Sequence, residues 1–396
     1  MSLQHLPKSI WILGFVSMLM DISSEMIHSL LPLFMVSALG LSTTSIGLIE
    51  GIAEGTAMVV KVFSGSLSDY LGKRKWIAAF GYGMSALTKP LFALANGVGF
   101  IFTARMMDRI GKGIRGAPRD ALIADITPAH MRGAAFGLRQ SLDTVGAFIG
   151  PLLAVGLMLL WVNDFRRVFW IAVIPALLAV LLIMFGVSEP DQRDKPRLGN
   201  PISRANLKRL SGSYWLVVGI GAVFTLARFS DAFLILRAQQ VGVPTSLVPL
   251  VMVAMNVVYS ASAYPFGKWS DRVSRITMLA CGLVVLILAD LVLAAGHSWW
   301  YLALGVALWG MHMGMTQGLL AAMVAATAPV DLRGTAFGLF YLMSGLALFV
   351  ASAVAGWLWD AYGAALTFYA GAGFCGLTLL ALFLFARRNA AQIEQA

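Results

Sequence analysis

The chain has 396 residues, of which 59% are hydrophobic and only 12% are charged. Soluble domains have about 45–50% apolar and about 25% charged residues, so this composition excludes a globular protein in water. The net charge of +10 would favour a nucleic-acid partner only if Lys and Arg formed a water-facing patch, whereas most of them lie in short loops between apolar segments. We therefore expect the chain to lie in a lipid bilayer and to bind no nucleic acid.

Apolar segments long enough to cross a hydrocarbon core recur along the whole chain. The first one is too long for the apolar region of a signal peptide, so we expect an uncleaved helix. The predicted helices are 9–38, 44–64, 76–95, 98–122, 133–161, 167–187, 212–238, 245–265, 276–296, 299–326, 334–358 and 364–386. The polar stretch after the sixth helix predicts a solvated linker. The predicted division is a six-helix bundle at 1–190, a cytoplasmic linker at 191–211 and a second six-helix bundle at 212–396.

Lys and Arg are distributed unequally between the two sides of this predicted membrane protein. The loops after even-numbered helices, the linker and both termini hold most of the cations that lie outside the spans. The loops on the opposite side hold Arg166 and Arg167. Positively charged loops remain in the cytoplasm, so we expect both termini and the linker to be cytoplasmic.

Two segments recur along the chain at a nearly constant spacing. Residues 40–73 end in GSLSDYLGK and residues 242–275 end in GKWSDRVSR, at an offset of 202. The motif RGAAFGL at Arg132 recurs as RGTAFGL at Arg333, at an offset of 201. The chain is therefore interpreted as a duplicated six-helix unit, and parallel repeats of this kind are one known transporter design.

The segment after the second predicted helix carries a glycine, acid and base pattern that returns after the eighth. The first copy has Gly65, Leu67, Asp69, Gly72, Lys73 and Arg74, and the second keeps Gly267, Asp271 and Arg272. The pattern resembles the G-x-L-a-D-r-x-G-r-r signature of the major facilitator superfamily. The resemblance implies an all-α membrane protein with twelve transmembrane helices, arranged as two pseudo-symmetric bundles around a central cavity. It further implies a latch at these motifs and a monomer in a bacterial inner membrane.

The fifth predicted helix carries a second motif, formed by Gly146, Gly150 and Pro151. It is similar to the family's antiporter-associated motif G-x-x-x-G-P-x-x-G, with Ala154 at the position of the later glycine. Glycines four residues apart form a flat helix face that allows close packing. Antiport and close packing both explain this motif.

The fourth predicted helix concentrates charge within its apolar segment. It holds Arg105, Asp108, Arg109, Lys112 and Arg115, which would together cost about 12–18 kcal/mol at the bilayer centre. Four of these residues share one face, so this face must meet either a watery cavity or acidic partners. The candidate acids are Asp21, Glu25, Glu50, Glu54 and Asp143. Lys112 and Arg115 are expected to be gating elements.

In the family that the chain resembles, helices 1, 4, 7 and 10 line the central cavity. The candidate cavity residues on these helices are Asp21, Glu25, His28, Arg105, Arg109, Arg228, Asp231, His312 and Gln317. Proton coupling requires a carboxylate whose ionised form is disfavoured by burial. The candidates for this role are Glu25, Glu50, Glu54 and Asp21. Lys61 and Lys89 are instead expected to reach toward a membrane surface, without a functional role.

These observations favour a secondary transporter without a cofactor. The first hypothesis is a proton-coupled exporter, an antiporter that moves a small polar or amphiphilic organic solute, with a preference for anions. The alternatives are proton-coupled uptake of an organic anion or a metal chelate, and export of a transition metal or siderophore. The positions of Asp21, Glu25 and His28 on one helix face fit half of a metal site, but we expect no bound metal. A membrane enzyme is disfavoured because the sequence has neither H-E-x-x-H nor G-x-S-x-G, and a receptor without transport activity is a further alternative.

Overall fold

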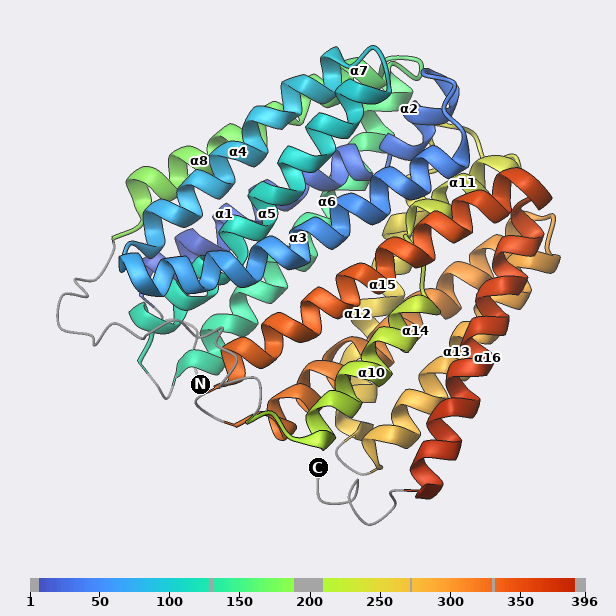
Figure 1. Ribbon diagram of the computed structural model, residues 1–396. Coiled ribbons are helices and arrows are strands. Elements are labelled where there is room, and N and C mark those ends of the chain that lie inside the picture. The colour runs from blue at the N-terminus through green and yellow to red at the C-terminus, as the bar shows by residue number, and fades with distance from the viewer. Residues whose placement is uncertain (1–6, 129–130, 189–208, 271–272, 330–331, 389–396) are drawn as a thin grey trace. The chain divides into compact units, whose positions relative to one another are not determined.

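The computed structural model describes residues 7–128, 131–188, 209–270, 273–329 and 332–388. The described part of the first half consists of helices (Figure 1). They are α1 (Lys8–His28), α2 (Leu31–Ser37), α3 (Thr43–Leu71), α4 (Arg74–Leu94), α5 (Val98–Ile126), α6 (Arg132–Leu160), α7 (Phe165–Ile171) and α8 (Val173–Gly186). The second half follows the same plan. Its helices are α10 (Gly212–Leu226), α11 (Ala232–Gln240), α12 (Leu250–Ser270), α13 (Arg275–Ala295), α14 (Trp299–Thr327), α15 (Arg333–Tyr362) and α16 (Ala364–Arg388).

The helix bounds reproduce the predicted duplication. α4 and α13 both have 21 residues and begin 201 residues apart. α5 and α14 both have 29 residues and begin at the same offset of 201. α6 and α15 also begin 201 residues apart, at the repeated Arg-Gly motif. The prediction of a duplicated all-α architecture is confirmed.

Three predicted single spans are each divided into two helices. Pro32 lies in the first turn of α2, where its missing N–H costs nothing, so the chain re-enters a helix directly after α1. α7 and α8 meet at Ala172. Between α10 and α11 the break is longer, and the Ser230 hydroxyl there accepts a bond from the Ala232 N–H at 3.3 Å. These breaks place polar backbone at positions where a continuous helix was expected.

The first gating motif lies mostly within a helix. α3 continues to Leu71, beyond the predicted end at residue 64, so Gly65 is helical. Gly72 ends the helix with a φ of +62°, a conformation that glycine adopts without strain. The loop between α3 and α4 is therefore shorter than the motif, and Lys73 occupies the position before α4 without a capping bond from its side chain.

Contacts between residues divide the described chain into two compact units. Unit 1 comprises Met1–Leu39 and Thr56–Asn200, and unit 2 comprises Gly40–Gly55 and Pro201–Ala396. The first half of α3 thus belongs by its contacts to unit 2, although it precedes most of unit 1 in sequence. The predicted bundle boundaries at 190 and 212 and the predicted linker remain predictions, since residues 189–208 lie outside the described ranges.

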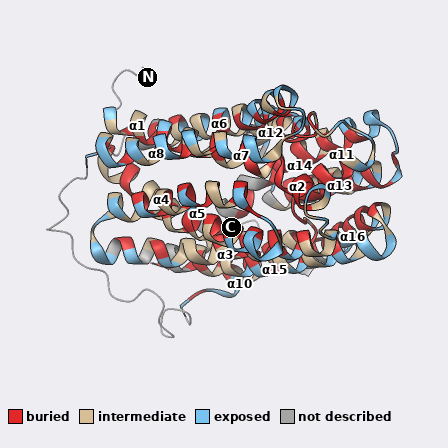
Figure 2. Cartoon of the chain, turned by 90° about the horizontal axis from the view of Figure 1, so that it is seen from above, coloured by how far each residue is buried: buried red, intermediate tan, exposed pale blue. Residues whose placement is uncertain are grey.

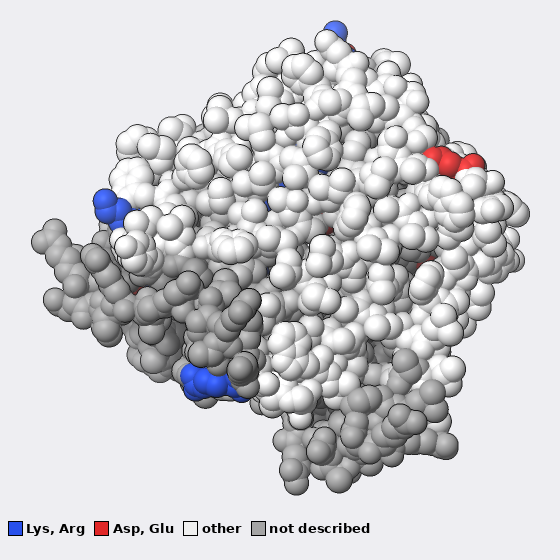
Figure 3. All heavy atoms as spheres, viewed as in Figure 1, with Lys and Arg blue, Asp and Glu red and all other residues white. Residues whose placement is uncertain are grey.

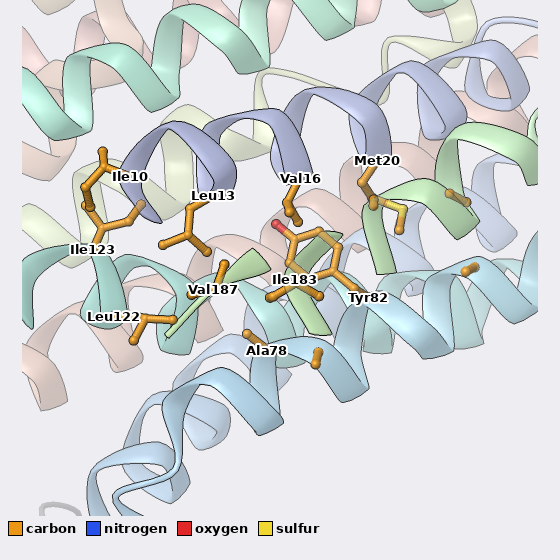
Figure 4. Packing of buried hydrophobic residues seen from close by; sticks show 14 of the residues in the cluster. Ile10, Leu13, Val16, Met20, Ala78, Tyr82, Leu122, Ile123, Ile183 and Val187 are labelled. Carbon is orange, nitrogen blue, oxygen red and sulfur yellow. The ribbon is translucent and has the colours of Figure 1, made fainter. Parts of the chain in front are cut away.

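The core of unit 1 is an apolar cluster between the helices α1, α4, α5, α6 and α8 (Figure 4). Ile10, Leu13, Val16 and Met20 follow one face of α1 and are all fully buried. They pack against residues of α4, α5 and α8, including Ala78, Tyr82, Leu122, Ile123, Ile183 and Val187. Because Tyr82 carries a hydroxyl into this cluster, polar contacts begin directly beside the apolar core.

Large apolar side chains are also exposed, as expected for helices in lipid. α8 exposes Leu177, Leu181 and Phe185, while other positions of the same helix are buried, and Figure 2 shows both classes along the helices. On the face drawn in Figure 3, most described atoms belong to uncharged residues. Among the described residues, five spans are long and apolar enough to cross a membrane by length and composition. They are Lys8–Ser37, Ala135–Leu160, Phe165–Gly186, Ile276–Ala295 and Ala336–Tyr362.

Candidate functional site

The two acidic residues of α1 lie where two glycines of α6 pack closely against it. A Cβ atom built on Gly146 would lie 2.7 Å from the Met18 carbonyl oxygen and 3.0 Å from the Asp21 Cβ. A Cβ built on Gly150 would lie 2.8 Å from the Glu25 Cβ. Any larger residue at these positions would push α1 away. The antiporter-like motif therefore determines how closely α6 packs against the turn of α1 that carries both carboxylates.

Glu25 has several charged neighbours within unit 1. Among the cations, Lys112 of α5 has the largest electrostatic effect on Glu25, followed by Arg109 and Arg105. Asp21 contributes a like charge. Arg105 also contacts α1 directly, since its guanidinium lies 3.0 Å from His28 Nδ1. The structure thus brings predicted residues of α1 and of α5, the fourth predicted helix, together. Among the described residues, no group of three or more His, Cys, Asp or Glu side chains is arranged to hold a metal ion.

Asp108 is paired with a residue whose role the sequence did not indicate. Lys89 of α4 is 1% exposed, and its Nζ donates to Asp108 Oδ1 at 2.9 Å and to the Ser24 hydroxyl at 3.1 Å. Arg109 Nε lies 3.8 Å from the other Asp108 oxygen. The expectation that Lys89 reaches toward the membrane surface is wrong, because a buried acid on α5 needs a cation close by.

Arg115 lies in the interface between α4 and α5. Its guanidinium donates to the Ser85 hydroxyl at 2.5 Å and lies 5.0 Å from the centre of the Tyr82 ring. Tyr82 in turn shares a hydrogen bond of 3.2 Å with Ser17, which accepts from Arg119 at 2.8 Å. A series of polar contacts therefore links Arg115 through the Tyr82 ring and the Ser17 hydroxyl to Arg119 within unit 1. The sequence indicated the basic residues but not the hydroxyls that bind them.

The residues expected to form the gate are only partly described. Arg74 pairs with Asp125 at 2.7 Å, which joins the start of α4 to the end of α5. Gly65 faces Ala117 of α5, and Lys73 and Lys112 are exposed. The side chain of Asp69, the burial of Gly267, and the residues Asp271 and Arg272 lie outside the described part of the chain, as does the side chain of the cavity candidate Gln317. Asp143, expected as a partner of α5, binds Arg139 of its own helix at 2.6 Å.

In unit 2, Asp231 and Arg228 lie at the break between α10 and α11. Arg228 NH2 is 3.9 Å from Asp231 Oδ1, and the Trp309 indole N–H donates to the same oxygen at 3.0 Å. The charge of Glu54 also acts on Asp231, within the same unit. The structure thus places three of the predicted residues near one another and adds Trp309, which the sequence did not single out.

His312 and Glu50 are enclosed in unit 2. His312 is fully buried, its Nδ1 lies 2.8 Å from the Gly282 carbonyl oxygen, and its ring stacks on Phe224 with a centroid distance of 5.4 Å. A carbonyl only accepts, so Nδ1 is the donor. Glu50 is also fully buried. These contacts explain the burial of His312 as a packed core residue. Its role in a cavity remains a prediction.

The first half of α3 is held against α15 within unit 2. Gly47, Gly51 and Gly55 are four residues apart, and a Cβ built on Gly51 would lie 3.0 Å from the Phe349 backbone. At the end of this contact, Asp360 accepts bonds from the backbone N–H groups of Thr43 and Thr44 and from both hydroxyls. The spacing of the glycines is the signal that could have predicted this close packing.

A duplicated helical fold with exposed apolar faces and buried charged side chains is typical of a membrane transport protein. The Major Facilitator Superfamily model matches residues 13–236 and 216–395 of this chain. An uncharacterized MFS-type transporter of Methanocaldococcus jannaschii is 34% identical over 362 residues, which cover 90% of this chain and 89% of the relative. The chain belongs to the Major Facilitator Superfamily, and it is an integral membrane transporter of a small-molecule solute and not an enzyme.

Two further comparisons agree with this assignment. Quinolone resistance protein NorA of Staphylococcus aureus is 22% identical over 364 residues, covering 90% of this chain and 91% of the relative. The crystal structure of a mutant of the nucleoside transporter NupG has a TM-score of 0.79 at 14% identity, covering 95% of this chain and 99% of that chain. At such identity the likeness to NupG shows the fold alone.

Proposed function

We propose that this transporter is a proton-coupled exporter of a small polar or amphiphilic organic solute that carries a negative group. It works as a monomer by alternating access, in a bacterial inner membrane with both termini in the cytoplasm. The name of the NorA relative supports export, because a transporter protects a cell from a drug by removing it. The uneven distribution of Lys and Arg between the loops supports the orientation.

The observation that carries the proposal is the position of Glu25 beside the basic face of α5. Lys112, Arg109 and Arg105 attract an anionic group of the solute, and the Glu25 carboxylate attracts a cationic or hydrogen-donating group. A proton that binds Glu25 removes this second attraction. Proton and solute then compete for one carboxyl group, and competition of this kind produces exchange of the two across the membrane.

A second candidate function, uptake of an organic anion by symport, follows from the same residues. Protonated Glu25 no longer neutralises Lys112 and the arginines, so these cations become available to an anion. Proton and anion would then bind together and move in the same direction. The two candidates differ in sign: competition weakens solute binding as pH falls, whereas cooperation strengthens it.

The sign can be measured on the purified full-length protein. Thermal stabilisation by a panel of anionic, cationic and neutral compounds, including the acidic quinolone nalidixic acid, is recorded at two pH values. The compound that stabilises most is then tested in right-side-out and inside-out vesicles with an imposed proton gradient. Export predicts weaker stabilisation at the lower pH and accumulation in inside-out vesicles whose lumen is acidic.

Glu25→Gln is the informative variant, and Asp21→Asn is its matched control on the same face of α1. Under the proposal, Glu25→Gln abolishes the pH dependence of binding and proton-driven accumulation, while Asp21→Asn keeps both. Stronger stabilisation at low pH in the wild type would replace export by symport. An unchanged pH dependence in Glu25→Gln would remove Glu25 from the mechanism.

A further inference from the structure

The duplication places a base and an acid at equivalent positions. Lys89 of α4 and Asp290 of α13 are separated by 201 residues, the offset that relates these two helices. In unit 1, Lys89 pairs with Asp108 of α5. The residue of α14 that corresponds to Asp108 is Trp309, whose N–H donates to Asp231. The ion pair of the first repeat therefore has no counterpart in the second, where a carboxyl group stands in place of the ammonium.

Asp290 is enclosed between α13 and α16. Its exposed fraction is 0%, and within the part of the chain that the structure describes neither carboxyl oxygen has a hydrogen-bond partner. A Cβ built on Gly371 of α16 would lie 2.7 Å from Asp290 Oδ2 and 3.1 Å from the Phe229 ring. The glycine therefore provides the space that the carboxyl group occupies.

The surroundings of this carboxyl group are aromatic and apolar. The Phe229 ring lies 5.5 Å from Trp309, 5.6 Å from Phe368 and 5.3 Å from Phe233, measured between ring centres. Three titratable side chains on neighbouring helices, Cys375, Arg237 and His312, have their hydrogen bonds elsewhere. Cys375 donates to the Ala227 carbonyl at 3.6 Å, Arg237 to the carbonyls of Leu293 and Gly296 at 3.0 and 2.7 Å, and His312 to Gly282 at 2.8 Å.

An enclosed carboxylate without a cation or hydrogen-bond donors is costly. A metal ion would need several ligands, and among the described residues no group of three or more His, Cys, Asp or Glu side chains gathers around Asp290. A proton needs only one carboxyl oxygen. We propose that Asp290 is a proton-binding site within unit 2, occupied by a proton in the state described here and separate from the Glu25 region of unit 1.

The position of this site connects it to the break between α10 and α11. Phe229, which lies against Gly371 together with Asp290, is the neighbour of Arg228 in the sequence and close to Asp231. When the Asp290 carboxyl group gives its proton to water, the remaining carboxylate needs water around it, so Phe229 must move away. Protonation of Asp290 thus stabilises the arrangement of the break that holds Arg228 beside Asp231. This coupling extends the proposed function, whereas proton binding itself does not depend on it.

Infrared spectroscopy of the purified full-length protein tests the proposal directly. The C=O stretching band of a protonated carboxyl group without a hydrogen bond is expected in the wild type, with a shift in D₂O. Asp290→Asn is expected to lose this band. Cys375→Ser keeps Asp290 but introduces a hydroxyl on the neighbouring side chain, which is electrostatically coupled to it, so the same band is expected to shift to lower frequency.

Asp164→Asn is the control, because Asp164 is a partly exposed carboxylate at the start of α7, and it should leave the band unchanged. The proposal is overturned if the wild type and Asp290→Asn have identical spectra. If Asp290→Asn does not fold, Cys375→Ser decides instead, and a band that stays in place in that variant overturns the proposal. It is equally overturned if NaCl raises the unfolding temperature of the wild type over choline chloride and this effect disappears in Asp290→Asn, since the ligand is then a metal cation. Neither measurement involves transport, so a failure of the exporter proposal would leave the result intact.

Discussion

α5 and α14 occupy the same place in the two repeats, yet only α5 is rich in charge. Arg105, Asp108, Arg109, Lys112 and Arg115 of α5 correspond, at the offset of 201, to Val306, Trp309, Gly310, Met313 and Thr316 of α14. The packing partner is retained, because Gly81 of α4 faces Arg115 and its counterpart Gly282 of α13 faces Thr316. This glycine contact is therefore kept in both repeats, although the charges of α5 have no counterpart in α14.

The largest effect expected from this difference is at Lys89. Lys89→Met leaves Asp108 buried without its closest cation, and breaking a buried ion pair by removing one partner costs about 3–5 kcal/mol. The unfolding temperature in detergent should fall strongly. Asp290→Asn, at the equivalent position of unit 2, should change it little, because it removes no ion pair.

A double variant distinguishes the pair from the side chain alone. Lys89→Met combined with Asp108→Asn removes both charges, so it should recover part of the stability that Lys89→Met loses. If the double variant loses as much stability as Lys89→Met and Asp108→Asn lose separately, the interaction between Lys89 and Asp108 does not stabilise unit 1. The contrast between the two repeats then has another origin.

A smaller effect is expected where α6 packs on α1. Gly150→Ala places a methyl group 2.8 Å from Glu25 Cβ and from the Ile22 carbonyl oxygen, and such overpacking costs about 1–3 kcal/mol. Because the methyl group displaces the turn that carries Glu25, transport should fall as well. The equivalent position of α15 already holds an alanine, Ala351, so the requirement for glycine is specific to unit 1.

Gly156→Ala is the matched control on the same helix, since a Cβ at this position meets no atom within 4 Å. It should leave the unfolding temperature unchanged or raise it slightly, as alanine favours a helix. Equal losses in Gly150→Ala and Gly156→Ala would show that backbone propensity matters here and that close packing against Glu25 does not.

The sequence predicted those features that depend on local pattern. Apolar length and the repeated Arg-Gly motif were sufficient for the helical segments and their duplication, because both are written along the chain. The partner of Asp108 was missed, since a lysine in an apolar segment fits a membrane surface as well as a buried pair until the packing of α4 on α5 is known. The break between α10 and α11 was also missed, because residues 227–231 contain neither Gly nor Pro. Asp290 could have been noticed by comparing the repeats, as the equivalent of Lys89.

The smallest effect on stability is expected at Arg228, the basic residue of the loose pair in unit 2. Its guanidinium is 3.9 Å from Asp231, and the two side chains are 25% and 20% exposed, so the pair contributes at most about 0.5–1 kcal/mol. Arg228→Gln should therefore unfold near the wild-type temperature, because Asp231 keeps its bond from Trp309. Transport of the compound selected by thermal stabilisation should nevertheless decrease, if Arg228 serves the solute. A loss of stability as large as that of Lys89→Met would mean that unit 2 depends on its ion pair as unit 1 does, and the contrast between the repeats would then be confined to α5 and α14.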